Sequence, residues 1–426
     1  MSGVISTLRS SFSPLRIPNF RIYLGGQAVS LIGTWLQATA QGWVVWELTK
    51  SSEALGVVTM LGTLPILLLG LWTGVWADRF DRRKLLIGTQ IGAMILAITL
   101  AILVQTNSVQ LWHVYILSLL LGVVTALDMP AQQAFLGDLS GMSEIRKAVN
   151  LNGMIIQVSR LVGPALAGFV VARLGAAPAF WLNGLSFLAV VVSFVAVRSS
   201  QVKSTSQGKP LQQAWEGVQF IRTQPPMLDL YIFAGMVVFF VLSIVLSQLP
   251  AVASEVLKGD AETLGALMSA SGAGALVGVL LIVPLTQAMA RSGLVLGLAT
   301  AWMSIWLLVF PMATTLPFSL ISLFFGSMGA PTVLTLALGL VQLMSPAAMR
   351  ARLLSLFTMV SFGLQPIASL LVGFSAGHFG IQHAIQINAV LLFAGAVIML
   401  VFRGELRRWR VNLGAIQPVP ISEGLH

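Results

Sequence analysis

Long apolar runs recur along almost the whole chain, and this pattern constrains the fold more than any other feature of the sequence. About 20 consecutive apolar residues are enough for a helix to cross the hydrocarbon core of a bilayer. The runs fall at residues 20–47, 54–77, 84–105, 111–133, 148–173, 178–198, 228–253, 261–287, 292–312, 316–343, 352–377 and 384–403. We therefore predict an all-α membrane protein with twelve transmembrane helices.

The composition excludes most other classes of protein. Of the 426 residues, 57% are hydrophobic and only 9% are charged, whereas a soluble domain has about 25% charged residues. This excludes a soluble globular enzyme. The chain has no cysteine, no phosphate-binding loop of the ATPase type, and no helical i, i+4 pair of histidines that would suit a metal. We expect no enzymatic activity, no metal and no cofactor.

The basic residues indicate how the chain is oriented in the membrane. There are 24 Lys and Arg against 14 Asp and Glu, an excess that would suggest nucleic acid as partner in a soluble protein. With the N-terminus in the cytoplasm, 20 of the 24 lie on the cytoplasmic side, and the other side has only Lys50, Arg173 and Lys258. Cytoplasmic loops are typically enriched in this way. We expect a multi-pass protein of the cytoplasmic (inner) membrane with both termini cytoplasmic and no nucleic-acid partner.

The two sets of six runs also resemble each other in sequence. Five matches follow in the same order at offsets of 204–209 residues: Tyr23 with Tyr231, 48–56 with 257–265, 82–88 with 291–297, Arg146 with Arg350, and Asn183 with Asn388. Such a parallel repeat is typical of transporters in which the substrate path lies between two helical bundles.

The repeat divides the chain into four parts. We expect an N-terminal six-helix bundle at 1–198, a cytoplasmic linker at 199–225, a C-terminal six-helix bundle at 226–404 and a cytoplasmic tail at 405–426. The linker is the longest polar stretch, and the spacing of its apolar residues predicts a short amphipathic helix at the membrane interface.

The most specific motif is GVWADRFDRRK, which runs from Gly74 to Lys84 between the second and third runs. Asp78 closes a helix C-terminus, where the helix dipole disfavours an anion, so its carboxylate needs a partner. The candidates are the adjacent arginines, or the N-terminus of the eleventh helix, expected to begin at Ser345–Pro346.

This loop resembles the signature loop of the major facilitator superfamily. The matching positions are Gly74, Asp78, Arg79, Arg82 and Arg83, while Asp81 replaces the second glycine of that signature. The resemblance implies a cytoplasmic latch that forms when the cavity faces outward. The alternative is that the cations merely anchor the loop on the cytoplasmic side. Gln287 stands where the second half would have the equivalent of Asp78, so the latch should be one-sided.

Two further features lie in the fifth run. Gly163, Pro164 and Gly168 resemble the glycine-proline motif of the exporter branches of the superfamily, although Gly and Pro are common in membrane helices anyway. Arg160 is a cation inside a span, which is costly unless it faces the bundle interior or water. We expect Asp128, on the fourth helix, to be its counter-ion. The pair could take up a proton or an anionic substrate group, or it could be a purely structural ion pair.

Polar side chains at helical spacing predict the lining of a central cavity, because a polar face is costly against lipid. Most lie on the first, fifth, seventh and eleventh helices. The candidates are Gln27, Ser30, Thr34, Trp35, Gln37, Gln41, Gln157, Ser243, Ser247, Ser355, Thr358, Phe362 and Gln365.

The stretch WVVWELTKSSEALG and the run Pro-Ala-Gln-Gln-Ala-Phe after Asp128 are most similar to the branch of the superfamily that contains enterobactin-type siderophore exporters and macrolide efflux proteins. The resemblance implies a secondary active transporter that exports a small amphipathic solute by alternating access, with inward proton movement as the drive. The alternatives are a lipid or lysolipid flippase of the same fold and a membrane sensor that does not transport. As partners we expect a small-molecule substrate, membrane lipid and protons, and we expect a monomer.

Overall fold

The computed structural model describes residues 12–197, 210–287, 292–346 and 349–403, and every regular element in these ranges is helical. Eleven stretches there are long and apolar enough to cross a membrane. The helix α2, with 32 residues and a polar stripe, packs beside them as the twelfth. The predicted all-α membrane fold is confirmed. After the short turn η1 (Ser13–Arg16), the first half consists of α2 (Pro18–Thr49), α3 (Ser52–Arg79), α4 (Arg82–Gln105), α5 (Leu111–Leu174) and α6 (Ala177–Ala196).

The long helix α5 contains the fourth and the fifth predicted spans. Its path changes direction at Gly141, which has φ 72° and ψ 163°, a backbone conformation that glycine adopts without a steric penalty. The apolar stretches on either side are Leu111–Gly141 and Lys147–Leu174. One glycine therefore divides a continuous helix into two membrane spans.

Several spans of the second half are interrupted. The seventh span contains one π-helical turn, η2, a second, η3, follows shortly after it, and the eighth span contains one, η4. Prolines begin some of the segments, because proline cannot continue the hydrogen bonds of a helix interior. The elements are α7 (Pro210–Thr223), α8 (Pro225–Val237), η2 (Val238–Leu242), α9 (Ser243–Ser247), α10 (Leu249–Ala251), η3 (Val252–Val256), α11 (Ala261–Val277), η4 (Gly278–Ile282), α12 (Val283–Gln287), α13 (Ser292–Val309), η5 (Phe310–Met312), α14 (Leu316–Ser327), α15 (Gly329–Met344), α16 (Arg350–Gly363), α17 (Gln365–Phe379) and α18 (Ile381–Phe402).

The expected start of the eleventh helix is wrong. Ser345 terminates α15, and its hydroxyl donates to the Val341 carbonyl oxygen at 2.5 Å. The eleventh span begins only at Arg350, with Met349 as its N-cap residue. The hydroxyl of Ser345 satisfies a carbonyl of the preceding helix, so it does not cap the following one.

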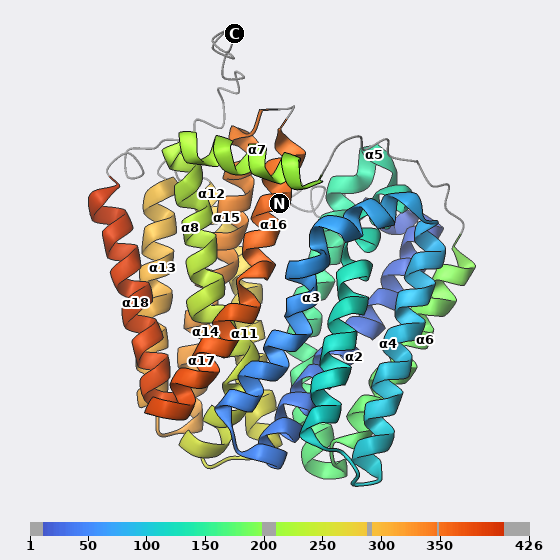
Figure 1. Cartoon of the computed structure of the whole chain (residues 1–426), viewed down its shortest axis with the longest axis vertical. Helices are drawn as coiled ribbons and strands as arrows, with labels where there is room; N and C mark the ends of the chain where they lie inside the picture. Colours follow the sequence, from blue (N-terminus) through green and yellow to red (C-terminus); the bar gives the residue numbers. More distant parts are fainter. Residues whose placement is uncertain (1–11, 198–209, 288–291, 347–348, 404–426) are drawn as a thin grey trace, which may run out of the picture.

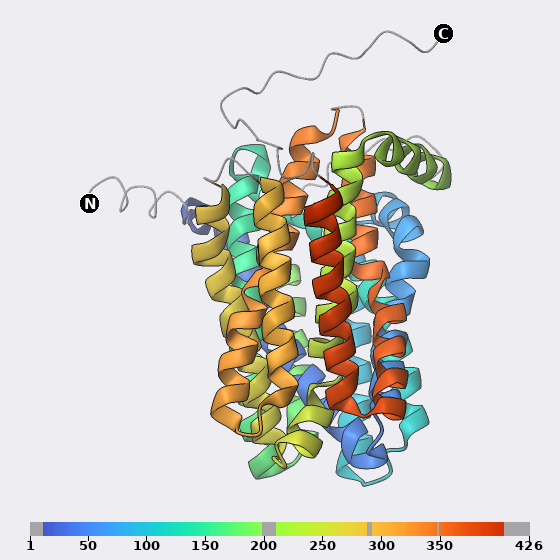
Figure 2. The same cartoon turned by 90° about the vertical axis from the view of Figure 1, so that its left-hand side faces the viewer.

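The helices form two groups that stand side by side (Figure 1). The chain enters at α2 and leaves at α18 at the same end of the molecule, which we call the terminal end (Figure 2). Across this end lies α7 (Figure 1). The opposite end, with the connections at 50–51, 175–176 and 257–260, is the short-loop end.

The two groups touch most closely near the short-loop end, along α3 with α17 and α5 with α11. Glycines allow this approach. A methyl group added at Gly56 would meet the Ser369 carbonyl oxygen at 2.6 Å, and one added at Gly265 would meet the Pro164 carbonyl oxygen at 2.6 Å. Small residues let backbones come together in lipid in this way. The groups are therefore packed backbone against backbone at the short-loop end.

Candidate functional site

A buried carboxylate on α5 is surrounded by uncharged hydrogen-bond donors. Asp128 accepts from the Thr89 hydroxyl at 2.6 Å and the Gln90 amide at 3.0 Å, both on α4, and from the Gln132 amide at 2.5 Å, one turn further on α5. The amide of Gln27 on α2 donates in turn to the Gln132 carbonyl oxygen at 3.1 Å. One polar network thus joins three helices of the first half.

Only one of the three partners of Asp128 could have been predicted from the sequence. Gln132 follows Asp128 by four residues and therefore lies on the same face of α5, so helical spacing could have indicated it. Thr89 and Gln90 precede Asp128 by 39 and 38 residues. No local pattern pointed to them, since their contact depends on how α4 packs against α5.

Arg160 lies apart from this carboxylate. Its guanidinium carbon is 5.6 Å from the ring centroid of Trp35 on α2, a typical cation–π distance. In the part of the chain that the structure describes, Arg160 forms no ion pair within 4.0 Å. The expected ion pair with Asp128 is thus corrected: neutral donors occupy the carboxylate, and the arginine stacks on an indole ring.

The polar stripe of α2 does not face a single cavity. Gln37 accepts from the Asn183 amide of α6 at 2.7 Å, and Gln41 donates to the Ser118 hydroxyl of α5 at 2.9 Å. Gln27, Ser30 and Gln37 are 4–6% exposed, whereas Thr34 is exposed and Trp35 and Gln157 are partly exposed. The expectation of a cavity lining is corrected for the buried glutamines, which hold α2 to α5 and α6.

The candidates of the second half fall into two groups. Ser243, Ser247 and Gln365 are buried, and the two serines donate to carbonyl oxygens one turn back on their own span. The amide nitrogen of Gln365 has no hydrogen-bond partner among the described residues. The exposed candidates lie together on α16; they are Ser355, Thr358 and Phe362.

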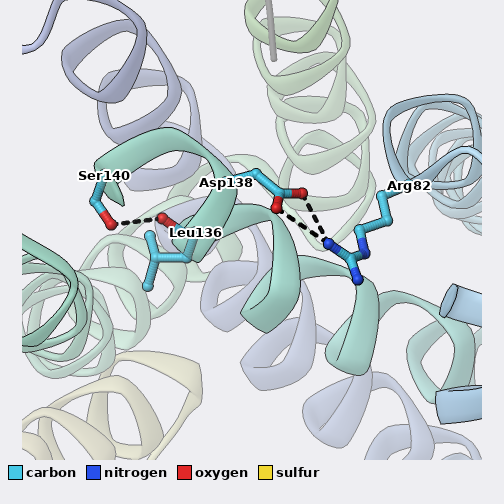
Figure 3. A network of polar contacts seen from close by, with 4 residues as sticks. All are labelled: Arg82, Leu136, Asp138 and Ser140. Atoms are coloured by element: carbon cyan, nitrogen blue, oxygen red, sulfur yellow. Dashed lines mark hydrogen bonds and ion pairs between the residues drawn. The ribbon is translucent and has the colours of Figure 1, made fainter. Parts of the chain in front are cut away.

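Two arginines of the signature loop, Arg82 and Arg83, bond within the first half. The Arg82 guanidinium lies 3.0 Å from a carboxylate oxygen of Asp138, with both side chains 7% exposed (Figure 3). Arg83 donates to the carbonyl oxygens of Phe194, at 2.6 Å, and Val195 near the end of α6, where helix carbonyls lack partners and the dipole favours a cation. These contacts tie α4 to α5 and α6.

Other parts of that loop cannot be placed. The helix α3 runs through to Arg79, but the side-chain surroundings of Gly74, Asp78 and Arg79 lie outside the described residues. The partner of Asp78 therefore stays a prediction. Asp138, which pairs with Arg82, was missed in the sequence because it lies 56 residues away.

The glycine-proline motif of α5 contacts one helix from each half. A methyl group added at Gly163 would meet the Ile32 carbonyl oxygen of α2 at 2.9 Å. One added at Gly168 would lie 2.9 Å from the Ala261 carbonyl oxygen and 3.0 Å from Gly265, both on α11. The motif therefore lies where α5 passes closest to α2 and α11.

Known proteins are similar to this chain over most of its length. A family model described as "Transmembrane secretion effector" matches residues 9–420. An uncharacterized MFS-type transporter of Bacillus subtilis, YfiS, is 31% identical over 60% of this chain and 61% of its own length. The enterobactin exporter EntS of Citrobacter koseri is 25% identical over 96% of this chain and 95% of its own length. The matches to YfiS and to two other curated relatives cover only 61–66% of the length of those proteins.

A solved structure has the same fold. The bacterial homologue of the human lysosomal transporter Spinster, in an inward-facing and occupied conformation, superimposes with a TM-score of 0.74 and 12% identity. The superposition covers 94% of this chain and 99% of that chain. At this identity the likeness concerns the fold alone.

Proposed function

The chain belongs to the transmembrane secretion effector family of the major facilitator superfamily, and from this premise we propose that it exports a small amphipathic solute by alternating access, driven by inward movement of protons. The family and its structural neighbours are transporters, so the protein is a multi-pass membrane transporter and not an enzyme. The similarity to an enterobactin exporter supports a siderophore-like or drug-like solute and the outward direction.

The position of Asp128 carries the proposal of proton coupling. In the described apolar stretches the other acidic residues lie within five residues of an end, whereas Asp128 lies 17 residues after the start of Leu111–Gly141. Among the described residues, only neutral donors bond to its carboxylate. It can therefore gain a proton without leaving a cation unpaired, which a carboxylate in an ion pair cannot do.

Protonation of Asp128 has a consequence for helix packing. An ionised carboxylate only accepts hydrogen bonds, whereas a protonated one must also donate. The three donors that now converge on Asp128 come from α4 and α5, so a proton on this carboxylate changes the hydrogen bonds that join the two helices. The same network contains a buried acceptor without a donor among the described residues, the side-chain carbonyl oxygen of Gln27, whose amide donates to Gln132. The proton would thus rearrange the contacts between α2, α4 and α5.

The contacts between the two halves support our proposal that two helical bundles move relative to each other. These are the bundles at 1–198 and 226–404, joined by the linker at 199–225 and followed by the tail at 405–426. Backbone-level packing joins them near the short-loop end. We propose that the terminal end is cytoplasmic, in line with the basic loops, and that the substrate path is closed toward the outside in this conformation. Export would then require the short-loop end to open.

The test is a flux assay in proteoliposomes with a pH-sensitive dye inside. The candidate solutes are a siderophore, a macrolide and a fluorescent lysolipid, the last to detect a flippase. Wild-type protein should move protons when one of the first two is added. Asp128→Asn should lose this proton movement but keep exchange of solute down its own gradient. Asp229→Asn is the matched control, because this buried carboxylate pairs with Arg403 at 3.3 Å near the terminal end; it should keep proton movement.

Three outcomes would overturn the proposal or a part of it. Full pH-gradient-driven flux in Asp128→Asn would end the assignment of the proton site. Movement of the lysolipid alone would replace the exporter by a flippase. A protein that moves none of the solutes but changes its thermal stability with one of them would be a sensor.

A further inference from the structure

We propose that Arg160, stacked on Trp35 between the two halves, binds an anionic group of the transported solute. The solute would carry a carboxylate or another ionised oxygen acid. This inference rests on the proposed export function, and it names the class of substrate that the same protein would take.

The charge of Arg160 is uncompensated within the described residues. In the described residues its guanidinium contacts the ring of Trp35. The ring attracts a cation, but it does not cancel the positive charge. A guanidinium has five N–H donors in a planar fork. A contact with the indole ring at this distance uses none of these donors as a hydrogen bond to an oxygen, so they remain available. A carboxylate is the group that matches this fork, since two parallel hydrogen bonds can form.

Asp128 is not available as this anion. Its two oxygens already accept from Thr89, Gln90 and Gln132. Every other acidic residue of the described apolar stretches lies near an end of its stretch. A cation inside a membrane protein faces the interior or a wet path and pairs there with an acidic side chain or with backbone carbonyl oxygens. In the described ranges no acidic side chain lies within 4.0 Å of Arg160, so a ligand is the natural source of an anion.

The stacked pair lies where both halves meet. A methyl group added at Gly272 of α11 would meet the carbonyl oxygen of Arg160 at 2.6 Å, and one added at Gly163 would meet the side chain of Trp35. The crossings of α5 with α11 and with α2 therefore fix the pair. Thr39 of α2 also approaches α11, since its hydroxyl lies 3.3 Å from the Met268 sulfur. A ligand on Arg160 would contact the region that must change when the halves separate.

Neutral polar groups surround this position. Gln157 lies one turn before Arg160 on α5 and is partly exposed. Ser269 lies one turn before Gly272 on α11, and its hydroxyl is buried without a partner among the described residues. Residues three apart lie on the same side of a helix, so Ser269 is on the side of α11 that faces α5. These groups can donate to an anion without competing for the charge of Arg160.

The test compares two dyes of similar shape and opposite charge, the anionic 5-carboxyfluorescein and the cationic rhodamine 123. Binding to purified full-length protein is followed by fluorescence polarisation. Arg160→Gln should weaken carboxyfluorescein binding by about tenfold or more and should not weaken rhodamine binding. Arg160→Lys should lie in between, because it keeps the charge but loses the planar fork. Arg173→Gln, which removes an exposed cation near the end of α5, is the matched control and should bind as wild type.

Should Arg160→Gln unfold, the Lys variant and Trp35→Ala give the same comparison, since each disturbs the site while keeping a cation. Equal carboxyfluorescein binding in wild type and in the Arg160 variants would overturn the inference, and so would wild-type protein that binds rhodamine 123 but not carboxyfluorescein. Flux in proteoliposomes separates the two proposals. Rhodamine export without carboxyfluorescein binding would keep the export function and reject the anion site. Arg160-dependent binding without any flux would keep the anion site and reject the export function.

Discussion

At the scale of single residues, the buried ion pair between Arg82 and Asp138 offers a test against an exposed one. Removing one partner of a buried pair costs about 3–5 kcal/mol, because it leaves an uncompensated charge. Arg82→Ala should therefore lower the unfolding free energy by about that amount. The pair of Arg352 with Glu216 is 33% and 39% exposed, and surface pairs contribute about 0–1 kcal/mol.

Arg352→Ala is thus the matched control and should be nearly neutral. Chemical unfolding of both variants in detergent, followed by tryptophan fluorescence, measures the difference. If the two variants lose the same stability, Arg82 does not hold α4 to α5 through its charge.

Single residues also show where sequence reasoning stopped. The chain contains one arginine in the middle of a predicted span, and the cost of burying a cation predicted a functional or a structural role for it. The group that it contacts could not be predicted. Asp128 was the nearest acid in the pattern, but α4 supplied two donors to it, and the arginine stacked on α2 instead.

At the scale of elements, the short turn η1 is held to α5 by a titratable contact. The Ser13 hydroxyl donates to a carboxylate oxygen of Glu144 at 2.5 Å, and the Lys147 ammonium lies 3.2 Å from the other oxygen. These donors, the hydroxyl first and then the ammonium, hold the pKa of Glu144 below its ordinary value of 4.5. Because the pKa is lowered in the folded protein, the contact stabilises the protein fully at pH values above the ordinary pKa.

The contact should therefore be complete at neutral pH, and it should weaken only as the pH falls through the lowered pKa of Glu144. Glu144→Gln should release η1 at every pH. Amide exchange of residues 13–16 by mass spectrometry at pH 7 measures this, with Glu262→Gln on α11 as the control that leaves η1 unchanged. Unchanged exchange in Glu144→Gln would show that the carboxylate does not dock this segment.

The amphipathic linker helix is another element whose existence the sequence indicated and whose contacts it did not. The helix α7 packs on α16, where a methyl group added at Gly217 would meet the side chain of Leu356 at 2.6 Å. The guanidinium of Arg352, on α16, also donates to the carboxylate of Glu216, on α7, at 2.5 Å. Amphipathic spacing predicts a helix with one apolar face, but it does not say which neighbour covers that face.

At the scale of the whole molecule, the alternating access that we propose requires the short-loop end to open, and a crosslink there should prevent it. A methyl group added at Gly377 of α17 would lie 2.9 Å from Cγ of Glu53 on α3, which is close enough for a disulfide. The chain has no cysteine of its own, so Glu53→Cys with Gly377→Cys is the one pair that can form. Oxidation should abolish solute flux in proteoliposomes, and reduction should restore it.

The single-cysteine variants serve as controls, and oxidation should not change their flux. Mass spectrometry of the oxidised double variant gives the fraction crosslinked. Full flux in a completely crosslinked protein would mean that the two halves do not separate at this end during transport.

The number of membrane spans and their helical type were predictable from the sequence, whereas the start of the eleventh span and the interruptions of the seventh and eighth were not. A span in lipid must satisfy its backbone hydrogen bonds within itself. A local run of about 20 apolar residues therefore predicts each membrane helix. The sequence repeat likewise indicated two bundles, and the structure contains a buried tyrosine packed against a phenylalanine in each half: Tyr23 with Phe135 and Tyr231 with Phe357.

Only the tertiary structure decided which polar groups meet. Gln37 and Gln41 lie on one stripe of α2, yet one bonds to α6 and the other to α5. These choices depend on the rotation and crossing of whole helices, which are set by glycine contacts such as that of Gly168 with Gly265. Apolar periodicity is a property of neighbouring residues along the chain, whereas a hydrogen bond between helices is a property of their relative placement. For this reason the spans and the fold class could be predicted from the sequence, whereas the network around Asp128 and the contact of Arg160 with Trp35 could not.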